Sequence, residues 1–322
     1  GEGSEHMSLH QAELTPVSST RDLGATMTAN GSSSKESHLK QTREVAGRQV
    51  PWDTYCKADL ISDRELQMIK RFDKRPLATK LDLVLDPQEG ALYLQALCTM
   101  LKSIASEEVV QYVLTALEEL AVEGGEEVAD KLLATERQGA SEVSSVLLRM
   151  LQRPDAFTRA KAATVLSLML DRELAAVTHG APPGPSQQTA QSLVEWLCEE
   201  MRRPSDGGLL VAVGTKCLSI LLKHRPVRAL VLKANGIPCI AAQLEATDGA
   251  SSSGRDPQLV YESALSCWLL SYHEAAVVEM VRLNVQRHLC EICKVVQKEK
   301  ILRVCLAALQ NCLACLAKTN TQ

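Results

Sequence analysis

Two pairs of cysteines near the C-terminal end are the residues whose spacing best fits metal chemistry. Each pair has the form Cys-x-x-Cys, and 18 residues separate the pairs, which is the spacing of a zinc site: Cys290, Cys293, Cys312 and Cys315. A zinc knuckle needs a tight turn between paired ligands, but neither intervening dipeptide contains Gly or Pro, and both pairs lie in helical patterns. We therefore interpret the four thiols as small core residues. A zinc-dependent structural module is the alternative, and it would require metal in the purified protein.

Other fragments of enzyme motifs are incomplete. His273-Glu274 opens a metalloprotease motif, but Val277 stands where the second His is required. Gly214-Thr215-Lys216 reverses the order of Lys and Thr in a phosphate-binding loop, and a nucleophile elbow around Ser251 would need Gly in place of Ser253. We find no paired carboxylates and no Cys-His arrangement that local structure would bring together. The sequence predicts no enzymatic activity and no catalytic, cofactor-binding or metal-binding residue.

Two short basic groups raise the question of an anionic partner. They are Lys70-Arg71 with Lys74-Arg75, and Lys223-His224-Arg225 with Arg228. Because cations favour the C-terminal ends of helices, we interpret both groups as solvated helix ends, with an acidic partner surface as the alternative. Nucleic acid is not a predicted partner, since the formal charge is −4, aromatic residues make up 3% of the chain, and no single basic stripe exists.

A repeated helical pattern must position all of these residues. Residues 263–269 align with residues 307–313, small and apolar on small and apolar, so that Ala264 and Ala308 correspond at an offset of 308 − 264 = 44. The same pattern recurs around Cys217, which lies 264 − 217 = 47 residues before Ala264, and more weakly around Ala163. Repeats of about 40 to 47 residues built from two or three helices are armadillo and HEAT arrays, whose units must stack to bury their apolar faces.

The composition agrees with this interpretation. Apolar residues make up 45% of the chain while aromatics are scarce, which suits helices packed through Leu, Val and Ala. We predict an all-α fold, a right-handed superhelical solenoid of armadillo/HEAT-like repeats. The eleven cysteines are scattered through helical segments without a preceding secretory signal, which favours a reduced, cytosolic protein. No uncharged apolar run reaches about 18 residues, so we expect membrane association only through other chains.

Composition also divides the chain. Residues 1–44 are rich in Ser, Thr, Gly and charge, and they are predicted to be a disordered tail because they cannot bury enough surface to offset the entropy of ordering. Residues 45–322 are predicted to be the repeat domain. Two stretches within it, 180–185 and 248–256, are predicted loops because they are rich in Pro, Gly and Ser.

Local signals predict where helices begin and end. Ser62-Asp63-Arg64-Glu65 is a capping box, and Asp155 and Asp256 are predicted N-caps, the latter followed by Pro at the first helical position. Gly124-Gly125 is predicted to end the helix that begins after Ser106, with a short helix to follow. In the link Asn235-Gly236, the glycine is predicted to adopt the left-handed conformation of a helix cap.

The last predicted helix, residues 300–318, is apolar on nearly all sides. A helix of this kind is normally enclosed, and few residues follow it to cover its far face. We therefore expect that a following repeat or domain belongs to the full-length protein.

Several short stretches resemble one known family in order and spacing. At the ordered N-terminal end they are Val50-Pro51-Trp52-Asp53-Thr54-Tyr55, Ile61-Ser62, Ile69-Lys70-Arg71-Phe72-Asp73 and Val110-Gln111-Tyr112-Val113-Leu114-Thr115. At the C-terminal end they are Trp268-Leu269-Leu270-Ser271-Tyr272, Lys298-Glu299-Lys300 and Ala307-Ala308-Leu309-Gln310-Asn311. The chain resembles the regulatory H subunit of the vacuolar-type proton ATPase (V-ATPase) from about Val50 to Lys318.

The resemblance implies a non-catalytic regulatory and scaffolding subunit that couples ATP hydrolysis to proton pumping. In this family the N-terminal array activates ATP hydrolysis and touches the E and G subunits of the peripheral stalk. The family's C-terminal domain reaches the membrane-embedded a-type subunit and silences the free soluble ATPase sector, and we expect the given sequence to stop before that domain. The implied location is the cytosolic face of vacuolar, endosomal or other acidic-compartment membranes, with attachment through the complex. The resemblance supplies no individual contact residues.

A peptide-binding adaptor of the armadillo type, unrelated to the pump, is the alternative function. Such arrays pair a Trp with an Asn one turn later, so that the amide can bind an extended peptide backbone. Here Trp268 is followed four residues later by Tyr272, which argues against this alternative.

Overall fold

The computed structural model describes residues 32–139, 142–178, 186–203, 208–245 and 256–319. Within these ranges the chain forms sixteen helices and no strand. The helices are α1 (Ser32–Ala46), α2 (Trp52–Lys57), α3 (Asp63–Phe72), α4 (Leu77–Leu85), α5 (Gly90–Ser103), α6 (Glu107–Arg137), α7 (Val143–Met150), α8 (Ala156–Thr178), α9 (Ser186–Arg202), α10 (Leu209–Leu221), α11 (Arg225–Lys233), α12 (Ile237–Glu245), α13 (Pro257–Leu270), α14 (Glu274–Arg282), α15 (Val285–Val295) and α16 (Glu299–Thr319).

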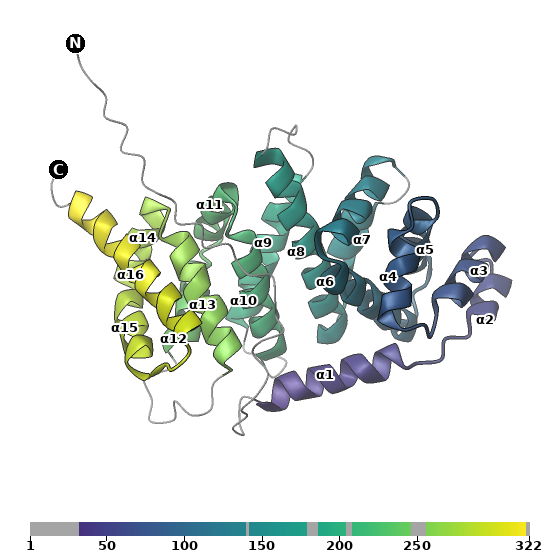
Figure 1. The fold of residues 1–322 in the computed structure, drawn as a ribbon, viewed down its shortest axis with the longest axis horizontal. Helices are drawn as coiled ribbons and strands as arrows, with labels where there is room; N and C mark the ends of the chain where they lie inside the picture. The colour runs from purple at the N-terminus through teal and green to yellow at the C-terminus, as the bar shows by residue number, and fades with distance from the viewer. Residues whose placement is uncertain (1–31, 140–141, 179–185, 204–207, 246–255, 320–322) are drawn as a thin grey trace, which may run out of the picture.

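Five helices form a ladder through the molecule. Helix α6 packs against α8, α8 against α10, α10 against α13, and α13 against α16. Helices α7, α9, α12 and α15 pack on this ladder, and the array extends from α2 and α3 at one end to α16 at the other (Figure 1). One continuous apolar core runs between the helices. The prediction of an all-α solenoid is confirmed.

The predicted repeat explains how neighbouring helices of the ladder approach one another. Ala163 on α8, Cys217 on α10, Ala264 on α13 and Ala308 on α16 each have 0% of their surface exposed. Small side chains at these equivalent positions allow successive helices to pack closely, in an interior that leaves few voids. The offsets found in the sequence therefore correspond to successive units of the stack.

Several predicted helix starts are confirmed in atomic detail. The Ser62 hydroxyl accepts from the Glu65 amide at 3.3 Å, and the Glu65 carboxylate accepts from the Ser62 amide at 2.8 Å, which completes the capping box of α3. Asp155 accepts from the Thr158 amide at 2.7 Å before α8. Asp256 accepts from the Gln258 amide at 3.0 Å before α13. These caps satisfy amides that the first helical turn leaves without a carbonyl partner.

One glycine prediction is confirmed and another needs correction. The range labelled α6 joins two helices across a break at Gly125, which has the non-helical angles φ 54° and ψ −133°, as the Gly124-Gly125 pair predicted. In the link between α11 and α12 the left-handed residue is Asn235 (φ 51°), not Gly236. Gly236 is required for a different reason, because a Cβ there would lie 2.6 Å from the Cys198 sulfur. Asn235 can adopt the left-handed conformation itself, so Gly236 is needed only where the backbone passes close to Cys198.

The predicted disordered tail must also be shortened. Ser32–Ala46 form helix α1, which runs along one side of the array, whereas the prediction placed residues 1–44 in a disordered tail (Figure 1). The remainder of the tail and the predicted loops, apart from Asp256, lie outside the described residues. The sequence did not predict α1 because the segment is mostly polar. The helix is ordered by docking onto other helices rather than by burying a large apolar face of its own.

Helix α16 is the last described element and is only partly covered. Ile301, Cys305, Ala308 and Cys312 are at most 3% exposed, but Leu306 and Leu313 are 52% and 65% exposed. Over Glu299–Lys318 its mean hydropathy of 1.5 makes it the one described helix that is long and apolar enough to cross a membrane, although charged residues interrupt its apolar run. Its buried face packs on α13 and α15 and continues the solenoid.

Candidate partner-binding surface

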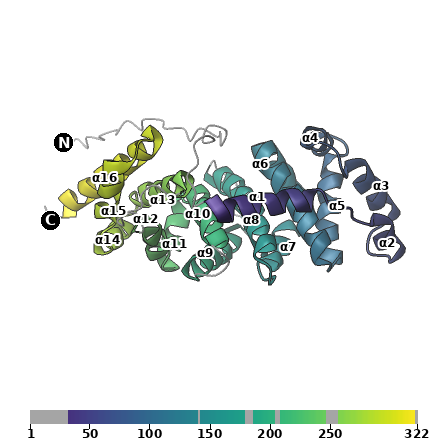
Figure 2. The same cartoon turned by 90° about the horizontal axis from the view of Figure 1, so that it is seen from below.

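Helix α1 lies across the ladder, over α6, α8 and α10 (Figure 2). Val45 is its fully buried anchor, with 0% of its surface exposed, while Leu39 remains 48% exposed. Just beyond the helix, the Arg48 guanidinium donates to the Gln111 side chain at 2.8 Å and to the Glu108 carbonyl at 3.4 Å. The docking is therefore mostly polar, with little apolar area to hold it.

Beneath the middle of α1 lies a surface that we call the α1 seat, formed by Gln111 and Glu118 of α6 and by Phe157 and Lys161 of α8. The Lys161 ammonium donates to the Thr42 hydroxyl of α1 at 3.0 Å, and the ring of His38 lies 5.3 Å from that of Phe157. These contacts fix α1 at the junction of two neighbouring units.

His38 is the titratable residue of this contact. Burial lowers its pKa from 6.5 to about 4, and the positive charge of Lys161 adds to the effect. The negative charge of Glu118 raises the pKa of His38, and the positive charge of Lys216 lowers it further. His38 is therefore neutral at pH 7 with α1 in place, and its protonation opposes docking.

An ion pair between Lys161 and Glu118 forms the floor of the seat. Their side chains are 3% and 17% exposed, and Lys161 also lies 5.1 Å from the centre of the Phe157 ring. Nearby, Gln111 donates to Asp155 at 3.1 Å. Because a buried charge is costly without a partner, the pair fixes the relative position of α6 and α8. Nothing in the sequence pattern distinguished these two residues from the exposed charges of the same helices.

The family-like stretches at the N-terminal end converge in space. Asp73 accepts from the Trp52 indole at 3.3 Å and from the Tyr112 hydroxyl at 2.5 Å. The rings of Trp52 and Tyr112 meet edge to face, with centroids 5.8 Å apart. Burial raises the pKa of Tyr112, and the Asp73 carboxylate raises it further. Residues from three separate stretches thus hold α2, α3 and α6 together, which is a structural role.

The stretches at the C-terminal end also meet. The Asn311 amide donates to the Ser271 hydroxyl at 3.0 Å, joining α16 to the end of α13. The Lys300 ammonium lies 4.3 Å from the centre of the Tyr261 ring. Tyr272, which stands where a peptide-binding array would carry Asn, is 57% exposed and lies against Arg228, whose guanidinium carbon is 5.3 Å from its ring centre. This position offers a ring and a cation rather than an amide.

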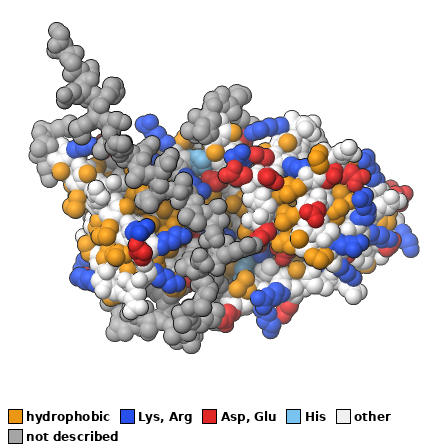
Figure 3. All heavy atoms as spheres, viewed as in Figure 1, with side chains coloured by type: hydrophobic (Ala, Val, Ile, Leu, Met, Phe, Trp, Pro, Cys, Tyr) orange, Lys and Arg blue, Asp and Glu red, His pale blue; other side chains and the backbone are white. Residues whose placement is uncertain are grey.

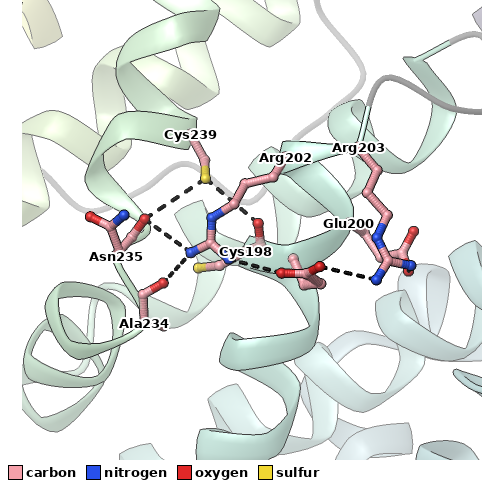
Figure 4. Close-up of polar contacts among 8 residues, drawn as sticks. Cys198, Glu200, Arg202, Arg203, Ala234, Asn235 and Cys239 are labelled. Atoms are coloured by element: carbon pink, nitrogen blue, oxygen red, sulfur yellow. Dashed lines mark hydrogen bonds and ion pairs between the residues drawn. The ribbon is translucent and has the colours of Figure 1, made fainter.

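A third polar cluster fastens α9 to the link between α11 and α12. The Arg202 guanidinium donates to the carbonyls of Ala234 and Asn235, the latter at 3.2 Å, and Cys239 lies 3.5 Å from the Cys198 carbonyl (Figure 4). Burial raises the pKa of the Cys198 thiol to about 12. Arg202 thus satisfies carbonyls that the end of α11 leaves free, and the thiols fill space as neutral groups.

The cysteines of the predicted zinc spacing are divided between two helices. Cys290 and Cys293 lie on α15, with Cys290 exposed, and Cys312 and Cys315 lie on α16, with Cys312 buried. Among the described residues, no group of three or more His, Cys, Asp or Glu side chains is arranged to hold a metal ion. The zinc alternative therefore gains no support from the geometry.

The two basic groups have different environments. Lys70 pairs with Asp53 at 2.6 Å and Arg71 with Glu89 at 3.1 Å. In the second group, Arg228 donates to the Leu222 and Lys223 carbonyls at the end of α10, as expected of a cation near a helix C-terminus.

The geometry defines a class of protein. Polar side chains that the sequence singled out join one helix to the next, and the exposed surface belongs to a long stack of helices. The structure resembles a designed armadillo repeat protein, with a TM-score of 0.56, 13% identity, and coverage of 76% of this chain and 98% of that one. An engineered protein matches with a TM-score of 0.55, 15% identity, and coverage of 79% and 98%. The chain is an armadillo-like α-solenoid.

The family follows from sequence comparison. The model of the family described as the H subunit of the V-ATPase matches residues 37–321, and the chain belongs to this family. A probable H subunit of the V-type proton ATPase from Oryza sativa subsp. japonica is 28% identical over 283 residues, which cover 85% of this chain and 61% of the relative. The corresponding V-type proton ATPase H subunit of Dictyostelium discoideum is 26% identical over 286 residues, covering 89% and 60%. The chain spans about three-fifths of the length of these relatives, and the predicted resemblance is confirmed.

Proposed function

We propose that this protein is a non-catalytic regulatory and scaffolding subunit of the vacuolar-type proton ATPase. Its role is to raise ATP hydrolysis by the assembled pump and to couple hydrolysis to proton transport. The observation that carries the proposal is the family match, which extends over residues 37–321 and so includes most of α1, its seat and the whole stack.

The proposed mechanism is mechanical. A rotary pump needs its static parts held at a fixed angle while the rotor turns, and a solenoid offers a long surface for many weak contacts. Stiffness requires that neighbouring units resist bending relative to one another. Largely buried ion pairs between helices supply that resistance, namely Lys161 with Glu118 and Arg159 with Glu200, and the side chains of the second pair are 14% and 6% exposed.

The proposed partners are other subunits of the same pump. We place the chain against the E and G subunits of the peripheral stalk, with the membrane-embedded a-type subunit and the soluble ATPase sector as further neighbours of the full-length protein. The proposed location is the cytosolic face of vacuolar, endosomal or other acidic-compartment membranes, where the complex provides the attachment. Nucleic acid is not among the proposed partners.

The test is reconstitution. Pump complexes that lack the H subunit receive this chain, and ATP hydrolysis and proton transport are measured in the same vesicles. We expect hydrolysis to rise, and pull-down to recover stalk subunits rather than basic or acidic peptides. A designed armadillo repeat protein of similar length serves as the control for non-specific crowding. Unchanged hydrolysis and transport with the correctly folded chain would overturn the proposal.

We also propose that α16 packs against a further helical unit in the full-length protein. Its outer face presents Leu302, Leu306, Leu309 and Leu313 at helical spacing, of which Leu306 and Leu313 are exposed and the others half-buried. Hydrophobic side chains gather at this end of the molecule (Figure 3). An apolar stripe of this kind is typical of a surface that another element covers.

A further inference from the structure

An open cavity lies beside the start of α4, between two links of the chain. The link from α1 to α2 forms one side and the link from α3 to α4 forms the other. The cavity has a volume of about 560 Å³. Its lining includes Gly47, Gln49, Lys74, Arg75, Lys80 and Glu119.

Lys80 is the residue that indicates a ligand. It is 7% exposed, it lines the cavity, and its ammonium lies 5.1 Å from the centre of the Phe72 ring. Among the described residues, its side chain makes no hydrogen bond and no ion pair. The charge of Lys80 acts on Glu119 of the same lining, and the Phe72 ring adds a cation–π attraction, but neither gives the ammonium a hydrogen-bond acceptor. An anion in the cavity would supply that acceptor.

The rim adds further donors of the same sign. Lys74 has φ 55° and is exposed, and it makes no ion pair with the described residues. Arg75 donates from Nε to the Arg71 carbonyl at 3.4 Å, which leaves its terminal nitrogens available. Helix α4 begins at Leu77 without a side-chain cap, so that the positive end of its dipole borders the cavity. The neighbouring Lys70 and Arg71 are already ion-paired and do not line it.

Glu119 is the acidic residue of the lining, against three cations. Burial raises its pKa, while the charge of Lys80 acts in the opposite direction. With Glu119 ionised, the lining still carries an excess of two positive charges. The cavity therefore suits a dianion better than a single carboxylate.

We propose that this cavity binds a phosphomonoester group. The group presents three terminal oxygens, which can meet the buried Lys80 from below and Lys74 and Arg75 from the rim, whereas a planar carboxylate presents two oxygens. The phosphate belongs either to a small soluble metabolite or to a lipid headgroup exposed on a membrane surface, and both sources share this chemistry. The inference does not depend on the proposed role in the pump.

The experiment uses two probes with the same phosphate chemistry. Glycerol 3-phosphate is titrated by calorimetry, and vesicles of phosphatidylcholine with and without phosphatidic acid are tested by co-sedimentation. We expect saturable binding to at least one probe. Binding to glycerol 3-phosphate alone identifies a soluble source, and binding to phosphatidic acid vesicles alone identifies a lipid source.

Four variants test the assignment of residues. Lys80→Met is expected to weaken binding about tenfold or more, and the double variant Lys74→Ala, Arg75→Ala to a similar extent. Glu119→Gln removes the competing carboxylate and is expected to tighten binding. Lys233→Met makes the same charge change at an exposed site remote from the cavity and is expected to alter affinity less than about twofold.

Thermal melts identify any variant that fails to fold. The double variant Lys74→Ala, Arg75→Ala replaces only exposed side chains, so it still tests the site if Lys80→Met is unstable. The proposal is overturned if neither phosphate probe saturates the protein. It is also overturned if the folded cavity variants bind as tightly as Lys233→Met, or if an acetylated tetraglutamate peptide binds more tightly than either phosphate probe.

Discussion

Separating the Lys161–Glu118 ion pair tests the claim that α6 and α8 are fixed by a buried charge contact. Each residue is replaced singly by an apolar one of similar size, Lys161→Met or Glu118→Leu, and the two changes are then combined. The side chains are 3% and 17% exposed, so either single change leaves a charge that water reaches poorly. Removing one partner of such a pair costs about 3–5 kcal/mol, much of it the penalty of the charge left behind.

The two single variants should lose different amounts of stability. Glu118→Leu leaves the more deeply buried ammonium, which retains the Thr42 hydroxyl and the Phe157 ring, and Lys161→Met leaves a carboxylate with some access to water. We expect the free energy of unfolding to fall by about 4 kcal/mol in Glu118→Leu and by about 3 kcal/mol in Lys161→Met. The double variant has no unpaired charge and should lie within about 1 kcal/mol of the parent protein, since a packed apolar pair often replaces a buried ion pair without loss.

Urea unfolding followed by circular dichroism measures the stabilities. Because a repeat array can unfold in segments, hydrogen exchange is measured in parallel on α6 and α8, with α13 and α16 as an internal control. The double-mutant cycle then gives the coupling between the two residues. Additive effects, or single variants that each cost less than about 1 kcal/mol, would show that the pair is hydrated and does not hold the helices.

Three further outcomes follow from the same structure. Because the pKa of His38 is lowered while α1 is docked, docking is strongest above pH 6.5 and weakens as the pH falls toward 4. Opening of α1, measured by hydrogen exchange, should therefore increase about tenfold when the pH is lowered from about 7.5 to 5.5. The variant His38→Gln should lose this pH dependence. Ala264→Leu would overfill a position with 0% exposure and should lower stability by about 1–3 kcal/mol, and a thermal melt matching the parent would contradict the packing. Replacing both Leu306 and Leu313 by Gln should change the free energy of unfolding by no more than about 0.5 kcal/mol in urea titration, because both side chains are exposed, whereas marked unfolding would show that the stripe is internally packed.

The polar contacts that join helices could be predicted only in part. Ser62 with Glu65 and Asp256 with Gln258 lie a few residues apart, so the sequence contained the whole interaction. Asp73 with Tyr112, and Asn311 with Ser271, join residues about 40 positions apart, and the sequence indicated only that these stretches resemble a family.

Helix α1 and the cavity beside α4 show the limits of sequence interpretation. The apolar content of α1 is too low to predict order, and only the Lys161 and Gln111 side chains of distant helices reveal why it is held. Lys80 looks like any exposed helical lysine until Phe72 and the two neighbouring links enclose it. The left-handed Asn235 was misassigned for the same reason, because the sulfur of Cys198, which requires glycine at the next position, comes from another helix.

The sequence by itself determined most of the helices, several of their caps, the repeat and the family, because these depend on residue spacing within a turn or a unit and on the similarity of one unit to the next. Only the tertiary structure decided which charges are buried, where α1 docks and which cations line a cavity. Those properties depend on how far residues distant in the chain exclude water from a charged group. The energy of a charge changes severalfold with this exclusion, and the local sequence around the charge does not show it.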